Sequence, residues 1–247
     1  MYNIWFYSLL SVFIVSLISL AGVFTLAFNQ EKLKGWLLSL VSFSAGALLG
    51  DVFIHILPEI SKNGWPLEAS FYLLAGIIIF FVLERFILWH YSHSEHEESI
   101  HSYTYLSLIS DGLHNLIDGV IIAAAFLTST TLGLATTLAV IFHEIPEELG
   151  HFAILIHGGF SKAKALFYNF LSALTAFVGA ILVLLLFKNI ETTPTPLLAI
   201  SAASFIYIAM SDLVPELHKE PNKKSAAWHL LWFILGIAIM WTLVLVE

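Results

Sequence analysis

The sequence HEIPEELGH at residues 143–151 lies inside a segment, residues 132–157, that is otherwise almost entirely apolar. A run of about 20 mostly apolar residues is long enough to cross a lipid bilayer as an α-helix. A charged side chain at mid-bilayer costs about 2.5–3.5 kcal/mol on insertion scales, so ionisable residues there usually serve a function. We therefore expect residues 132–157 to form a membrane span that carries a polar site.

The ionisable residues of this span follow helical spacing. His143, Glu147 and His151 form an i, i+4, i+8 stripe, and Glu144 and Glu148 form a second stripe beside it. A single buried His or Glu in a span is usually a helix–helix hydrogen bond. Several carboxylates packed together, however, repel one another unless protons or a cation neutralise them. The size of this cluster therefore indicates an ion site.

Pro146 stands inside the stripe. A proline within a helix frees the backbone carbonyl four residues before it, here that of Phe142, and kinks the helix. Free backbone groups at membrane depth are tolerated where they line a cavity. The position of Pro146 therefore predicts that the stripe lines a path.

A matching polar stretch, DGLHNLIDG at 111–119, lies in the preceding expected span, residues 104–127. His114 and Asp118 share one helix face, with Asp111 one turn earlier. If this face meets the stripe of the next span, two imidazoles and two carboxylates converge, which suits tetrahedral Zn²⁺. Such mixed ligands suit zinc, iron or manganese better than calcium, which prefers oxygen alone.

The composition agrees with a membrane location. Hydrophobic residues make up 59% of the 247 residues and charged residues only 11%, whereas water-soluble domains carry about 25%. The absence of cysteine excludes disulfides and thiolate metal sites. The net charge of −8 offers no basic patch for nucleic acid. The N-terminal MYNIWFYSLL lacks the basic region of a cleaved signal and is expected to begin the first span.

The chain is thus predicted to be an all-α integral membrane protein with one membrane transport domain, residues 1–247. A His-rich loop is expected at about 85–103. Eight spans are predicted, at about 4–28, 36–57, 67–89, 104–127, 132–157, 164–187, 195–216 and 226–246.

The distribution of Lys and Arg predicts the orientation, because cytoplasmic loops carry an excess of both. All ten Lys and Arg lie outside the span interiors, eight of them at odd-numbered loops and two at even-numbered loops. Odd loops, including the His-rich loop, are therefore expected in the cytoplasm, with both termini outside. The eight are Lys32, Lys34, Arg85, Lys162, Lys164, Lys219, Lys223 and Lys224, and the two are Lys62 and Lys188.

Two short patterns recur in spans that run in opposite directions under this topology. HILPE at 55–59 ends the second span and DLVPE at 212–216 ends the seventh, while HNxxD at 114–118 and HExxE at 143–147 occupy the fourth and fifth. Inverted repeats with a site at their interface are typical of transporters. We predict such repeats around spans four and five; the alternative is chance similarity between five-residue strings.

At these residues the chain resembles the ZIP (Zrt/Irt-like) family of divalent-metal transporters. The similar motifs are residues 111–119, 143–150 and GALLGDVFIHILPE at 46–59. The eight spans, the outward termini and the His-rich loop extend the resemblance over the whole chain. The stretches at 46–59 and 111–119 are most similar to the histidine-rich subfamily.

The resemblance implies alternating-access transport toward the cytoplasm by a homodimer in the lipid bilayer. We expect this bilayer to be the cell membrane, either a plasma membrane or a bacterial inner membrane. The implied substrate is Zn²⁺, with Fe²⁺, Mn²⁺ or Cd²⁺ as alternatives, and no organic cofactor. It further implies two ions, one held by His114, Asp118, His143 and Glu147, and the other by Asn115, Asp118, Glu144 and Glu147.

The chain departs from the family pattern at three places. The histidine-rich subfamily usually has His where Glu147 stands and Asp where His151 stands. Other branches have a metal-binding Glu in the sixth span, whereas residues 171–179 here contain no carboxylate. The second ion is therefore expected to bind more weakly than the first.

Two other functions remain open from the sequence. A buried zinc ion beside a carboxylate could activate water, as in an intramembrane zinc hydrolase. Against this, Glu147 replaces the second histidine of a His-Glu-x-x-His motif, and Pro146 breaks the helix that would present it. The other alternative is a passive, channel-like metal conductor. We expect a transporter and no enzymatic activity.

Overall fold

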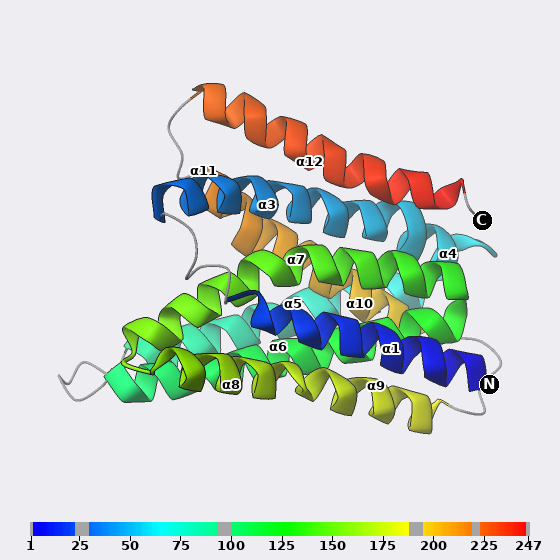
Figure 1. Cartoon of the computed structure of the whole chain (residues 1–247). Helices are drawn as coiled ribbons and strands as arrows, with labels where there is room; N and C mark the ends of the chain where they lie inside the picture. Colours follow the sequence, from blue (N-terminus) through cyan, green and yellow to red (C-terminus); the bar gives the residue numbers. More distant parts are fainter. Residues whose placement is uncertain (1, 23–29, 93–99, 188–194, 219–222, 246–247) are drawn as a thin grey trace.

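The computed structural model describes residues 2–22, 30–92, 100–187, 195–218 and 223–245, and these residues are helical apart from short turns (Figure 1). The all-α prediction is confirmed. The elements are α1 (Tyr2–Ile18), η1 (Ser19–Ala21), α3 (Gln30–Asp51), η2 (Val52–Ile56), α4 (Leu57–Ser61), α5 (Leu67–Ser92), α6 (Ile100–Thr128), α7 (Thr130–His157), α8 (Lys162–Ala173), α9 (Thr175–Leu186), α10 (Thr195–Tyr207), η3 (Ile208–Leu213), α11 (Val214–His218) and α12 (Lys223–Val244).

Seven stretches of the described chain are long and apolar enough to cross a membrane. The 28-residue helix α7 is not among them, although it is long enough, because three glutamates and two histidines of the polar stripe interrupt its apolar surface. The seven stretches are Asn3–Ala21, Leu37–Ser61, Leu67–Arg85, Ser107–Thr128, Lys162–Leu186, Thr195–His218 and Ser225–Val244.

The helices pack in two sets that meet along α7. In one set α3 packs along α12 and α10 along α5; in the other α6 packs against α7 and α9, and α1 against α7 (Figure 1). Contacts between α3 and α7 join the two sets. Two glycines set the close crossing of α6 and α9, since a Cβ on Gly119 would lie 1.9 Å from the Ala176 carbonyl oxygen and one on Gly179 would lie 2.0 Å from that of Leu116.

The two similar Pro-containing patterns have similar backbones. Short π-helical segments, η2 and η3, precede Pro58 and Pro215 respectively, and each is followed by a five-residue helix. The reason is shared: a proline lacks the N–H that would bond the carbonyl four residues earlier, so the helix widens there. Helix α3, which leads to the first segment, runs opposite to α10, which leads to the second (Figure 1).

The helices continue into two of the expected segments. Within the expected His-rich loop at 85–103, α5 continues to Ser92 and α6 starts at Ile100, and residues 93–99 between them lie outside the described residues. Helices extend past their apolar segments because a helix bonds its own backbone in water as well as in lipid. The expected sixth span, 164–187, consists of α8 and α9 with Leu174 between them.

Candidate metal centre

The connection between α6 and α7 places their polar faces side by side. It consists of one residue, Ser129, whose hydroxyl oxygen accepts a hydrogen bond from the Leu132 backbone N–H at 3.0 Å and so caps α7. A connection this short makes the two helices antiparallel neighbours. The expected meeting of the two faces therefore follows from local chain geometry.

Four side chains from these two helices converge. One ligand atom from each of His114, Asp118, His143 and Glu144 lies within 4.8 Å of the other three. The two Nε2 atoms of His114 and His143 are 3.2 Å apart, and the Oδ2 atom of Asp118 is 3.2 Å from the latter. Two ligand atoms that each bind one zinc ion at about 2.0–2.2 Å can be at most about 4.4 Å apart, so these spacings suit a shared ion.

The ring of His143 is already oriented. Its Nδ1 atom lies 3.2 Å from the Ala139 carbonyl oxygen one turn earlier, so Nδ1–H donates there and Nε2 keeps its lone pair toward the cluster. Metal-binding histidines commonly donate their second ring nitrogen in this way. The side chain is fully buried, so no solvent competes for Nε2.

Glu147 lies at the accessible edge of the cluster. Its Oε2 atom is 3.2 Å from Nε2 of His114, and its side chain is 26% exposed, against 0–1% for Asp118 and Glu144. The two helices thus present a closed side, formed by buried carboxylates, and an open side at Glu147.

The two ends of the Asn115 side-chain amide have different surroundings. Its side-chain NH₂ donates to the carboxylate and to the backbone carbonyl of Asp111, both at 3.1 Å. Its Oδ1 atom and the Oδ1 atom of Asp118 are buried and have no hydrogen-bond partner among the described residues. Buried oxygens without a donor are costly, and a cation is the natural partner for them.

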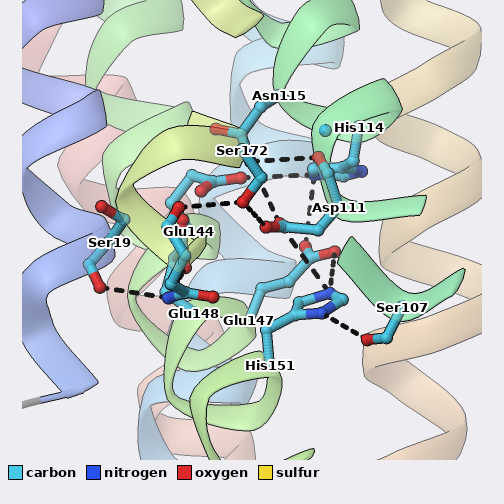
Figure 2. A network of polar contacts seen from close by, with 12 residues as sticks. Ser19, Ser107, Asp111, His114, Asn115, Glu144, Glu147, Glu148, His151 and Ser172 are labelled. Carbon is cyan, nitrogen blue, oxygen red and sulfur yellow. Dashed lines mark hydrogen bonds and ion pairs between the residues drawn. The ribbon is translucent and has the colours of Figure 1, made fainter. Parts of the chain in front are cut away.

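Neighbouring polar residues hold the rest of the cluster (Figure 2). Ser172 of α8 donates to Asp111, and Asn169 of the same helix donates to Glu148. The sixth expected span thus contributes an amide and a hydroxyl where a carboxylate was considered. Sequence reasoning did not select Ser172 as a site residue, because serine is common at helix contacts in membranes and has no distinguishing spacing.

The carbonyl freed by Pro146 has a specific partner. The hydroxyl of Ser44 on α3 donates to the Phe142 carbonyl and also lies 2.7 Å from the Leu40 carbonyl of its own helix. The expectation that Pro146 frees the Phe142 carbonyl is therefore met, and this carbonyl accepts its hydrogen bond from α3, in the neighbouring set of helices. Figure 1 shows α7 changing direction in its second half.

Comparison with known proteins agrees with this geometry. Residues 2–105 and 90–244 match the family described as ZIP Zinc transporter. The chain is 32% identical over 260 residues to Zinc transporter ZIP13 of Pongo abelii, covering 96% of this chain and 77% of that protein. It is 30% identical over 316 residues to Zinc transporter zipt-7.1 of Caenorhabditis briggsae, covering 99% and 80%.

A plant relative has a shorter match. IAA-alanine resistance protein 1 of Arabidopsis thaliana is 39% identical over 146 residues, which is 58% of this chain and 31% of that protein. The family match spans nearly all of the chain, and it includes both polar stretches of α6 and α7. The chain is an integral membrane protein that belongs to the ZIP zinc transporter family.

Proposed function

We propose that this protein carries Zn²⁺ across a membrane through the cluster between α6 and α7. The observation that carries the proposal is the convergence of two imidazoles and two carboxylates, those of His114, His143, Asp118 and Glu144, inside a chain of this family. Membership of a transporter family also argues against an intramembrane zinc hydrolase.

We place two ions in the cluster. The unpartnered oxygens of Asn115 and Asp118 support a second position beside the first. The second position has no imidazole, so it binds Zn²⁺ less tightly than the first. The first ion uses His114, Asp118, His143 and Glu147, with Glu144 facing both imidazoles; the second uses Asn115, Asp118, Glu144 and Glu147.

The chain crosses the membrane eight times in this proposal. The start of α1 and the end of α12 lie at the same end of the bundle, which requires an even number of crossings (Figure 1). The seven apolar stretches together with α7 give that number. The Lys and Arg distribution supports an orientation with both termini outside and residues 93–99 in the cytoplasm.

Alternating access then moves the α6–α7 set against the α3–α10 set. The two π-helical segments before Pro58 and Pro215, in oppositely running helices, support inverted repeats in the chain. The proposed exit lies past Glu147, toward the ends of α6 and α7 that carry residues 100 and 157, which are the cytoplasmic ends in this proposal. The unit is a homodimer in the cell membrane, and its single transport domain is the whole chain.

A flux assay in proteoliposomes tests the function. The purified chain should accumulate Zn²⁺ with saturable kinetics, and His143→Ala should reduce the flux to the level of empty liposomes. The same assay with Fe²⁺, Mn²⁺ and Cd²⁺ ranks the substrates. Flux that rises linearly with concentration would indicate a passive conductor, and hydrolytic activity without flux would indicate an enzyme.

A further inference from the structure

Glu147 faces two histidines on opposite sides. Its Oε2 atom lies 3.2 Å from Nε2 of His114, whereas its Oε1 atom lies 3.9 Å from Nε2 of His151. That second imidazole is also 3.9 Å from Oδ1 of Asp111. A second group of ligands, one imidazole and two carboxylates, therefore adjoins the first and shares Glu147 with it (Figure 2).

The members of this second group are held in place by other side chains. Ser107 Oγ lies 3.1 Å from Nδ1 of His151, which leaves Nε2 directed at the two carboxylates. Asp111 is 1% exposed and accepts hydrogen bonds from Ser172 and Asn115, one on each oxygen. Groups that orient a ligand from behind in this way are the usual surroundings of a metal site.

The spacing leaves room for an ion. Two ligand atoms at about 2.0–2.2 Å from one zinc ion can be up to about 4.4 Å apart, and both separations from His151, 3.9 Å each, fall within that limit, so an ion can lie between this imidazole and either carboxylate. They are too long for direct hydrogen bonds, so the imidazole is not already satisfied by either carboxylate. With Nδ1–H donating to Ser107, the Nε2 lone pair and the two negative groups together fit a divalent cation.

We propose that Asp111, Glu147 and His151 form a further transition-metal position, through which the ion passes on its way out of the cluster. This proposal rests on the proposed function. The position lies one helical turn nearer the 100 and 157 ends of α6 and α7 than His114, and its side chains at 147 and 151 are 26% and 17% exposed. Glu147 transfers the ion because each of its oxygens faces one position.

Zinc binding to the purified full-length chain in nanodiscs tests this position. Equilibrium dialysis with radiolabelled Zn²⁺ gives the number of ions and the affinity of each step. His151→Ala should leave the tightest step within twofold of wild type and weaken one looser step by at least about tenfold. Zinc efflux from loaded proteoliposomes should slow by a similar factor, because the ion loses its last ligands before release.

Three further variants separate ligation from structure. Ser107→Ala should weaken the same step by about tenfold, because it removes only the group that orients the imidazole. His151→Asp should restore binding, since it again supplies a ligand atom. His229→Ala, which removes a buried histidine side chain on α12, should change no step. If His151→Ala does not fold, Ser107→Ala and His151→Asp still show whether His151 binds the ion.

The outcomes distinguish the two proposals. If His151→Ala and Ser107→Ala leave every binding step within twofold of wild type while His143→Ala abolishes the tight step, the further position is wrong and the proposed function stands. If wild type binds no Zn²⁺ and shows no flux, the proposed function itself fails. Extended X-ray absorption on the zinc-loaded variant that carries both His114→Ala and His143→Ala should still find one nitrogen-ligated ion, with the nitrogen supplied by His151.

Discussion

At the scale of single residues, the proposed two-ion arrangement requires some ligands that serve one ion and others that serve both. The imidazole of His143 has its Nδ1 atom occupied by a backbone carbonyl, so only Nε2 faces the ions. Asp118, in contrast, has one oxygen 3.2 Å from that imidazole and the other without a hydrogen-bond partner among the described residues. The carboxylate can therefore bridge two ions, whereas the imidazole cannot.

Calorimetric titration of purified variants with Zn²⁺ should reveal this difference. His143→Ala should remove the tight step, because the first position loses an imidazole. Glu144→Ala should lose the weaker ion and should bind the tight ion with an affinity within about tenfold of wild type. The reason is that Oε1 of Glu144, 3.4 Å from His114 Nε2, is only one of several groups around the tight ion. Asp118→Ala should damage both steps.

Folding must be checked in each of these variants by size exclusion and thermal unfolding. Equal loss of tight binding in His143→Ala and Glu144→Ala would show that the division into a strong and a weak position is wrong. Loss of folding in all three, with unchanged zinc stoichiometry in the folded fraction, would mean that the cluster is structural.

At the scale of elements, the break in α7 is also a connection between the two helix sets. Pro146 deprives the Phe142 carbonyl of its partner within the helix, and Ser44 of α3 supplies one. Hydrogen bonds between membrane helices contribute about 0.6 kcal/mol on average and up to about 1.7 kcal/mol. A contact of this strength helps to align α7 with α3 and would not prevent the proposed movement of the two sets.

A double-mutant cycle measures this connection. Ser44→Ala should destabilise the fold by about 1 kcal/mol, because the Phe142 carbonyl loses its donor. In a Pro146→Ala background the same change should cost less, since residue 146 then has an N–H that can bond that carbonyl. Unfolding in denaturant gives the four free energies, and their interaction term should be about 0.5–1 kcal/mol.

Ser201→Ala is the matched control for this cycle. Ser201 bonds the Leu197 carbonyl of its own helix at 2.8 Å, as Ser44 bonds that of Leu40, and no bond from its hydroxyl to another helix is found in the described chain. Ser201→Ala should lower the free energy of unfolding by the same amount in the wild-type and Pro146→Ala backgrounds. An interaction term near zero for Ser44 would show that its hydroxyl does not support the freed carbonyl.

At the scale of the whole molecule, the position of the termini and the charges of the loops lead to the same topology. The start of α1 and the end of α12 lie at one end of the bundle, as an even number of crossings requires (Figure 1). Arg85, the four lysines of the first and fifth loops and the three lysines of the seventh loop make up the excess that supports the proposed orientation.

The absence of cysteine makes this topology simple to test. In intact cells a membrane-impermeant maleimide should label Asn63→Cys, in the second loop, and should label Ser94→Cys only after the membrane is opened. The unmodified chain, which has no thiol, is the control for background labelling. Labelling of Ser94→Cys from outside intact cells would reverse the proposed orientation and with it the direction of zinc movement.

Much of the site could be predicted from the sequence because its spacing is local. The 3.6-residue period alone places His114 with Asp118 and puts His143, Glu147 and His151 on one face. The chemistry of proline alone frees the Phe142 carbonyl. The one-residue connection at Ser129 then makes the two faces antiparallel neighbours.

The partners from distant helices were decided only by tertiary packing. Nothing in the sequence pairs Ser44 with Phe142, or Ser172 with Asp111, because such pairs depend on how each helix is rotated and how closely it approaches its neighbour. That approach is set by contacts such as Gly119 against α9. The same packing brought His114 to one oxygen of Glu147, whereas His151, four residues later on α7, faces the other oxygen through helical spacing.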